Sequence, residues 1–142
     1  MSGQDLVGIA SGMVDAFNAA DWDRVAEHLT SDAVYNELGT QRTINGRDEI
    51  IQALQSWKAA MPDVKGTITN SFSDGTTVSL EVSWTGTHTG PLETPDGVIP
   101  PSGKSQTTPA SWLLEFEGEK IKESRHYFDM VTLLTQIGAM PE

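Results

Sequence analysis

Hydrophobic residues near the start of the chain recur at steps of three and four, which is the spacing of one face of an α-helix. The first such stripe consists of Leu6, Ile9, Met13 and Phe17. Asp21 is then placed to cap a second, short helix whose inner residues are Trp22, Val25 and Leu29. These patterns predict two helices that each bury one face. The segment Ala33–Leu38 that follows them is a candidate for a short strand.

A third helical stripe comprises Ile50, Leu54, Trp57 and Met61. Pro62 stops this helix, because proline lacks the backbone N–H that a helix interior requires. We expect the helix to begin at Asn45, whose side chain can cap it. Asp48, three residues on, would be the reciprocal acid of a capping box.

Beyond Pro62 the period of the pattern changes to two, which is typical of β-strands with one buried face. The clearest strand alternates polar residues with Val78, Leu80, Val82 and Trp84. A weaker run with Val64, Ile68 and Phe72 precedes it, and Asp74-Gly75 between the two predicts a hairpin turn. Two more strands, Ala110–Phe116 and Ile121–Phe128, are joined by a turn over residues 117–119. The last helix, Met130–Ile137, would have Asp129 as its N-cap.

The segment Thr89–Lys104 between the second and third strands contains four prolines and three glycines. A loop of this length in a small domain is more often functional than not. We expect either an ordered lid or rim of a pocket, or a rigid surface excursion or dimer contact.

Helices followed by a meander of long strands predict an α+β architecture, with the N-terminal helices packed on a curved antiparallel sheet. We expect a single domain over residues 1–142. Where such a sheet is strongly curved, its concave face and the helices enclose a cone-shaped pocket.

The charge of the chain narrows the range of partners. With 20 Asp and Glu against nine scattered Lys and Arg, the formal net charge is −11, so binding to nucleic acid or an anionic membrane is not expected. The absence of cysteine rules out disulfides and thiolate sites, and the three histidines have no metal-ligand spacing. We therefore expect no metal and no cofactor. Without a signal-like start or an apolar run of membrane length, a cytoplasmic location is the default.

Several motifs resemble one protein family over nearly the whole chain. They are Thr85-Gly-Thr-His-Thr-Gly90, Ile99-Pro-Pro-Ser-Gly-Lys104, Gly118-Glu-Lys-Ile121, and Tyr127-Phe-Asp129 with Leu133-Leu-Thr-Gln-Ile-Gly138. These motifs resemble the SnoaL-like polyketide and ester cyclases of the nuclear-transport-factor-2-like superfamily. The resemblance implies the cone-shaped α+β barrel, a hydrophobic small-molecule ligand and a homodimer formed through the outer sheet face. One departure is Glu123-Ser-Arg125, where the polyketide cyclases usually carry Glu-His-Trp. This version resembles an ester-cyclase-like branch.

Asp129 matches the aspartate that acts as general acid and base in the cyclases. There it removes an acidic proton next to carbonyl groups, and the enolate closes a ring by an intramolecular aldol reaction. A carboxylate in an apolar cavity has a raised pKa, and it needs no cofactor when the C–H is already acidic. The alternative is that Asp129 is an ordinary helix cap.

Arg125 makes the role of Asp129 ambiguous. In a regular strand Glu123, Arg125, Tyr127 and Asp129 share one face, whereas His126 would lie on the outer face. Arg125 would then form a structural ion pair with Asp129. Alternatively, Glu123, Arg125 and Asp129 resemble the acid–arginine–acid arrangement of limonene-type epoxide hydrolases.

The other candidate site residues are one histidine and a set of aromatic rings. His88 shares the parity of the buried strand face, so it either donates to an enolate oxygen or holds the long loop in place. The candidates for substrate-binding walls are Tyr35, Trp57, Trp84, Trp112, Tyr127 and Phe128. Three functions remain open: a cyclase or ketosteroid-isomerase-like enzyme, a non-catalytic small-molecule-binding protein of the same fold, and an epoxide hydrolase.

Overall fold

The computed structural model describes residues 3–94 and 97–139. The helices are α1 (Gly3–Asn18), α2 (Trp22–Glu27), α3 (Arg47–Ala60) and α4 (Met130–Gln136). The strands are β1 (Leu29–Glu37), β2 (Arg42–Asn45), β3 (Lys65–Ser73), β4 (Thr77–Thr87), β5 (Leu92–Thr94), β6 (Gly97–Ile99), β7 (Ser105–Glu117) and β8 (Lys120–Phe128). Within the described residues, none of the helices combines the length and hydropathy needed to cross a bilayer.

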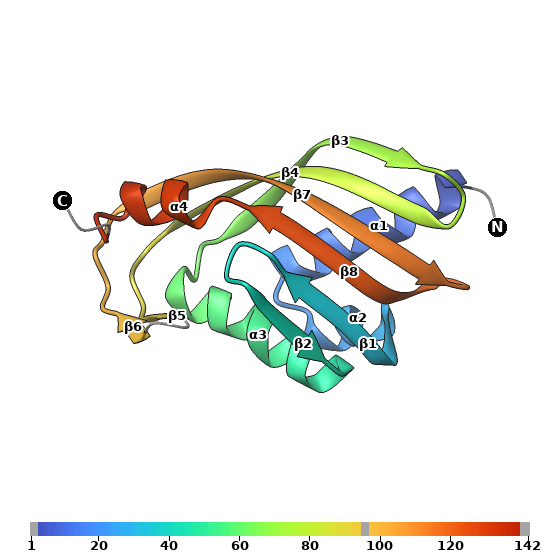
Figure 1. The fold of residues 1–142 in the computed structure, drawn as a ribbon, viewed down its shortest axis with the longest axis horizontal. Coiled ribbons are helices and arrows are strands. Elements are labelled where there is room, and N and C mark those ends of the chain that lie inside the picture. The colour runs from blue at the N-terminus through green and yellow to red at the C-terminus, as the bar shows by residue number, and fades with distance from the viewer. Residues whose placement is uncertain (1–2, 95–96, 140–142) are drawn as a thin grey trace.

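Six strands form one curved sheet in the order β2-β1-β8-β7-β4-β3, and α1, α2 and α3 cover one of its faces (Figure 1). The predicted α+β architecture is therefore confirmed. The sheet differs from the prediction in one respect, because β1 and β8 run parallel while every other neighbouring pair is antiparallel. The parallel pair joins the strands that come first and last in the chain, and it lies next to the edge strand β2.

The core lies between the helical layer and the concave face of the sheet. The stripe of α1 is buried at Leu6, Met13 and Phe17, as its spacing predicts. On the sheet side, the alternating residues of β4 that were predicted to face inward are buried from Val78 to Val82. The buried face of the helix and the buried face of the sheet thus pack together in one apolar layer, as expected when each element buries one face.

The start of α3 was predicted incorrectly. Asn45 does not cap this helix, because it lies in β2 and pairs with Val34 of β1. The N-cap is Gly46, which has φ of 96° and makes no side-chain hydrogen bond to the helix. A short strand that the hydrophobic pattern did not indicate therefore takes the place of the capping box.

A bulge in β8 determines which of its side chains face the core. Ile121 is buried and pairs with Phe116, but the next pair is Glu115 with Glu123, so the strand carries an extra residue at this point. An extra residue moves all later side chains to the opposite face. His126 consequently points inward, contrary to the prediction.

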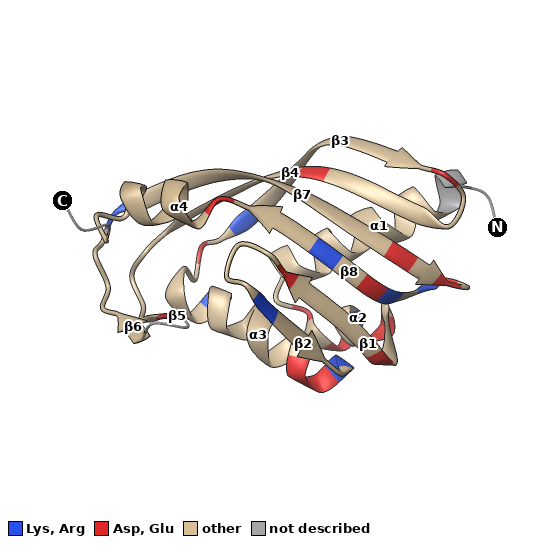
Figure 2. Ribbon diagram, in the orientation of Figure 1, with Lys and Arg blue, Asp and Glu red and all other residues tan. Residues whose placement is uncertain are grey.

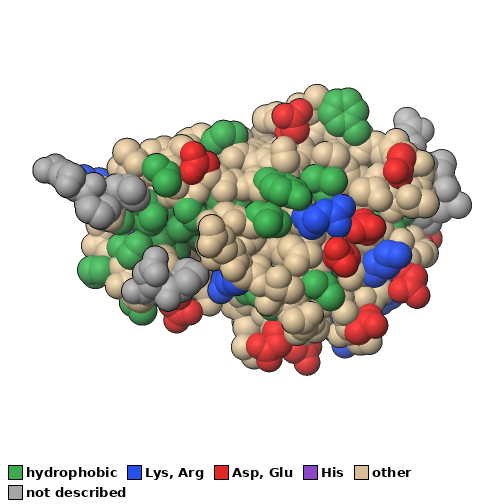
Figure 3. All heavy atoms as spheres, in the orientation of Figure 1, with side chains coloured by type: hydrophobic (Ala, Val, Ile, Leu, Met, Phe, Trp, Pro, Cys, Tyr) green, Lys and Arg blue, Asp and Glu red, His purple; other side chains and the backbone are tan. Residues whose placement is uncertain are grey.

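In the segment after β4, the strands β5 and β6 pair as a small two-stranded sheet, and residues 95 and 96 lie outside the described residues. Its strand β5 contacts α3 through the buried Leu92. Figure 3 shows hydrophobic side chains gathered at this end of the molecule, over α4 and the strands β5 and β6. Asp and Glu residues are spread over helices and strands alike (Figure 2).

Candidate functional site

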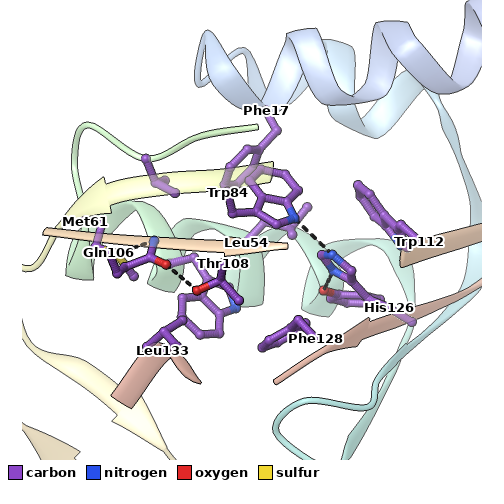
Figure 4. Close-up of a pocket in the computed structure, with 13 residues that line it drawn as sticks. Phe17, Leu54, Met61, Trp84, Gln106, Thr108, Trp112, His126, Phe128 and Leu133 are labelled. Carbon is purple, nitrogen blue, oxygen red and sulfur yellow. Dashed lines mark hydrogen bonds between the residues drawn. The ribbon is translucent and has the colours of Figure 1, made fainter. Parts of the chain in front are cut away.

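A cavity lies inside the curved sheet, between it and the helices α1 and α3 (Figure 4). It encloses about 560 Å³ not filled by atoms, part of it open to solvent, but the centre of a water molecule can move through only about 60 Å³. The space is therefore narrow. The lining residues are Phe17, Tyr35, Leu54, Trp57, Met61, Val64, Trp84, Gln106, Thr108, Trp112, His126, Phe128 and Leu133.

Two glycines allow the aromatic walls to pack this closely. A Cβ atom at Gly66 would lie 2.6 Å from the Trp84 ring, and one at Gly39 would overlap the ring of Phe128. Such distances are far shorter than a carbon–carbon contact allows. The rings of Trp84 and Phe128 can therefore occupy this side of the cavity only because Gly66 and Gly39 have no side chain.

His126 lies at the polar end of the cavity, bonded through both ring nitrogens (Figure 4). The Trp84 indole N–H donates to Nε2 over 3.1 Å, and the Tyr35 hydroxyl lies 2.8 Å from Nδ1. An indole nitrogen can only donate, so Nε2 carries no proton. The proton of the neutral imidazole must then sit on Nδ1 and be donated to the Tyr35 oxygen.

Burial and this bonding pattern keep His126 uncharged. Burial lowers its pKa to about 4, although the charge of Glu37 acts in the opposite direction. A second proton on Nε2 would also face the Trp84 N–H. The imidazole is therefore neutral at physiological pH.

We expect the free energy of unfolding to decrease as the pH falls from about 6.5 to about 4. The unfolded chain takes up a proton at His126 near pH 6.5, whereas the folded chain resists it until about pH 4. This difference corresponds to about 3 kcal/mol of stability, present at neutral pH and lost across that interval. Urea unfolding at a series of pH values would measure it. His126→Gln should show a shallower pH dependence, and an unchanged slope in that variant would contradict the assignment.

Glu37 is a carboxylate with no exposed surface beside the same end of the cavity. One oxygen accepts from Thr40 Oγ1 at 2.5 Å and Arg42 Nε at 2.8 Å, and the other accepts from Trp57 Nε1 at 3.0 Å. Burial raises the pKa of Glu37, but the hydrogen bonds from Arg42, Thr40 and Trp57 outweigh it, and the pKa is lowered overall. Glu37 is therefore ionised, and it fixes the indole of Trp57 in the cavity wall.

The cavity wall has further polar groups, all of them uncharged. On β7, the Thr108 hydroxyl donates to the Gln106 side-chain oxygen at 2.5 Å (Figure 4). Trp112, also on β7, stacks on His126 with ring centroids 4.7 Å apart. Its buried indole N–H has no hydrogen-bond partner among the described residues. Four residues of strand, about 13 Å, separate Thr108 from Trp112.

Five of the six aromatic residues proposed as walls line the cavity, namely Tyr35, Trp57, Trp84, Trp112 and Phe128. Tyr127 does not, and its 46% exposure follows from the bulge that turns it outward.

Arg125 lies on the outer face of β8 and Asp129 directly follows that strand, and neither residue lines the cavity. Asp129 is exposed and caps α4 by accepting from the Val131 N–H at 2.9 Å. The hydrogen bond from Thr132 lowers the pKa of Asp129, contrary to the raised value expected in an apolar cavity. Arg125 pairs with Glu115 at 2.5 Å and Glu123 at 3.2 Å, so the expected ion pair with Asp129 is not formed.

His88 is fully buried, as its parity predicts, but it is not among the lining residues of the cavity. Its Nδ1 accepts from the Ser102 backbone N–H at 3.2 Å and lies 3.0 Å from the Ser102 hydroxyl. Burial lowers the pKa of His88. In this position the imidazole holds the long loop against the end of β4.

Three features of the site were not predicted from the sequence: the inward orientation of His126, the burial of Glu37, and the Gln106–Thr108 pair. The alternation Gln106, Thr108, Ala110, Trp112 is visible in the sequence and could have extended β7 toward its start. Glu37 lies two residues after Tyr35, and that spacing alone places both on one face. Nothing in the sequence marks the bulge in β8.

A family model described as SnoaL-like polyketide cyclase matches residues 8–137. No curated protein matches the chain. Among solved structures, a protein from Jannaschia sp. CCS1 assigned as a SnoaL-like polyketide cyclase superposes with a TM-score of 0.87 at 20% identity, covering 98% of this chain and 95% of that one. A protein with a ketosteroid isomerase-like fold from Catenulispora acidiphila gives 0.79 at 21% identity, with 93% of each chain covered.

A third solved structure shows how widely this fold is used. AclR from Streptomyces galilaeus, assigned as a hydroxylase, superposes with a TM-score of 0.83 at 20% identity, covering 99% of this chain and 89% of that one. At such identities the superpositions establish the fold alone. They do not select one reaction, since a single fold supports unrelated chemistries.

Proposed function

This chain belongs to the SnoaL-like polyketide cyclase family, and on that premise we propose that it binds a flat, largely apolar carbonyl compound in its aromatic cavity. There it would promote removal of a proton next to the carbonyl, as in a cyclase or an isomerase, with no cofactor. The observation that supports the ligand class most directly is the lining. Aromatic and aliphatic side chains surround a few uncharged polar groups. This combination is typical of sites for apolar ligands with one or two oriented oxygens.

The narrowness of the cavity implies that a wall moves when a ligand enters. Leu133 belongs to α4, a helix of only seven residues. A single side chain, Gln136, ties that helix to the backbone of Thr107 through two hydrogen bonds of 2.7 and 2.9 Å. A short helix held in this way is the part of the wall that can be displaced at least cost.

For the proton abstraction we propose Asp129. It lies in the chain between Phe128 and Leu133, which both line the cavity, and this position supports a place at the cavity rim. Its lowered pKa keeps the carboxylate ionised but makes it a weak base. Such a base suits only a C–H that its neighbouring carbonyl groups already acidify.

The exposure of Asp129 favours a second candidate, a non-catalytic small-molecule-binding protein of the same fold. In that case the carboxylate serves only as the cap of α4, and ligand binding is independent of it. An epoxide hydrolase is not proposed, because Arg125 is engaged with Glu115 and Glu123 on the outer face and does not line the cavity.

Filling the cavity should weaken ligand binding. We expect Leu133→Trp to weaken binding of 2-tetralone, a bicyclic ketone, by at least about tenfold, because the larger ring occupies the ligand's space. Val131→Trp is the matched control, since Val131 lies in the same helix and is 56% exposed. Isothermal titration calorimetry on the two variants and the wild type measures the effect. Equal affinity in all three proteins would place the ligand elsewhere.

A further inference from the structure

We infer that the Tyr35 hydroxyl is the group that recognises the ligand's oxygen, and that His126 and Trp84 position it for an uncharged acceptor. This inference rests on the proposed function and specifies its substrate class. It adds that the oxygen bound at this end is a neutral carbonyl rather than a carboxylate.

The hydrogen bonds of His126 have a defined direction. Trp84 donates to His126 Nε2, so the imidazole must donate through Nδ1 to the Tyr35 oxygen. The Tyr35 hydroxyl therefore accepts from His126, and its own proton is left over for another acceptor. A hydroxyl whose oxygen accepts in this way is available as a donor at this end of the cavity.

Few acceptors lie close to the Tyr35 hydroxyl proton. Glu37 is the nearby acid, and a hydrogen bond from the Tyr35 hydroxyl to its carboxylate contributes to the raised pKa of Tyr35. Three other donors, on Thr40, Arg42 and Trp57, also bind that carboxylate, so it remains stabilised when the Tyr35 hydroxyl turns away. Because the O–H rotates about its C–O bond, it can turn from the side of Glu37 to a ligand oxygen.

A second unused donor lies at the same end. The Trp112 ring centroid is 6.1 Å from that of Tyr35, and the buried Trp112 N–H has no partner among the described residues. A buried donor without a partner is costly, which makes a ligand oxygen at this end favourable. Trp112 is thus independent support for an acceptor here.

The surroundings of Tyr35 disfavour a negatively charged ligand. Burial, the charge of Glu37 and the hydrogen bond to Glu37 raise the pKa of Tyr35 well above its usual value, and the opposing effect of Arg42 is smaller. Negative charge at this position is therefore disfavoured. No Lys or Arg is among the described residues that line the cavity. An anionic ligand would meet the field of Glu37, which Arg42 offsets only in part, whereas a neutral ketone would not be repelled by it.

Three bicyclic probes of similar shape test the inference: 2-tetralone, tetralin without the oxygen, and tetralin-2-carboxylate. We expect the wild type to bind the ketone more tightly than tetralin, and tetralin more tightly than the carboxylate. Tyr35→Phe should weaken ketone binding roughly 3- to 10-fold, the effect of one hydrogen bond, and leave tetralin binding unchanged. The carbonyl stretch of the bound ketone should move to higher frequency in this variant.

Thr108→Val is the matched control, because it also removes one hydroxyl from the lining but at a position about 13 Å along β7 from Trp112. It should leave the carbonyl stretch as in the wild type. Tyr35→Phe leaves the His126 N–H buried without a partner, so the double variant Tyr35→Phe/His126→Leu covers the case in which the single variant unfolds. The double variant should likewise lose the preference for ketone over tetralin.

The inference is overturned if Tyr35→Phe keeps the wild-type preference for ketone over tetralin, or if the carboxylate binds as tightly as the ketone. In both cases tetralin still binds, and the proposed function of the cavity stands. If neither the ketone nor tetralin binds the wild type, the proposed function itself fails, and the inference fails with it.

Discussion

Replacing Asp129 by Asn is expected to slow proton abstraction by about 100-fold or more, the usual contribution of a general base. The substitution removes the basic oxygen but retains an oxygen that can accept from the Val131 N–H, and Asn caps helices as well as Asp does. The measurement is exchange of the C1 protons of 2-tetralone for deuterium, followed by NMR. These protons lie between an aromatic ring and a carbonyl, so they are acidic enough for a weak base.

Asp129→Ala removes both the basic oxygen and the oxygen that caps α4. Comparing it with Asp129→Asn, which keeps the cap, therefore separates the two roles of the carboxylate. Asp129→Ala should lower the unfolding temperature, which Asp129→Asn should leave close to that of the wild type. Exchange that is normal in Asp129→Asn would mean that the carboxylate is only a cap and that another group removes the proton. The non-catalytic binding protein would instead show no exchange above the buffer rate even in the wild type, with ligand affinity retained in both variants.

Replacing Glu37 by Ala is expected to destabilise the fold by about 3 kcal/mol. The cost arises because the substitution leaves the donors of Thr40, Arg42 and Trp57 without their acceptor in a largely buried place. Arg42 reaches solvent in part, which keeps the cost at the lower end for a broken buried ion pair. Urea unfolding measures the change, and near-UV circular dichroism should report the loosened indole of Trp57.

Glu123→Ala is the control for this prediction, since Glu123 also pairs with an arginine but has a side chain 41% exposed. Removal of a surface ion pair costs between 0 and about 1 kcal/mol. If the Glu37 and Glu123 variants lose similar stability, the buried cluster contributes no more than a surface pair, and its assigned role in holding Trp57 is wrong.

The architecture was largely predictable from the sequence, because it follows from periodicity. The stripe of α1 and the alternation in β4 each bury one face, and turn residues such as Gly75, with φ of 98°, separate the strands. These signals are local and repeated, so they survive single irregularities. The Gly46 cap was missed because β2 is only four residues long and carries no clear alternation.

The site was less predictable, because it depends on one bulge. In a regular strand every second residue after the buried Ile121 would face the core, which places Arg125 and Asp129 inward. The extra residue before Glu123 reverses this alternation, so that His126 faces the core instead. The aromatic walls were predicted better because most of them lie on elements without such a shift. The hydrogen-bond chain from Trp84 through His126 to Tyr35 joins three strands, and no local pattern records such a contact.

The parallel pairing of β1 with β8 has a consequence for the order in which the molecule assembles. Tyr35 and His126, which bond across this pair, are 91 residues apart in the chain. During synthesis β1 has only the short β2 to pair with, and an isolated two-stranded hairpin is marginally stable. Contacts between such distant segments also form slowly. The polar end of the cavity is therefore completed only after β8 has emerged, so that the capacity to bind a ligand is acquired at a late stage of folding.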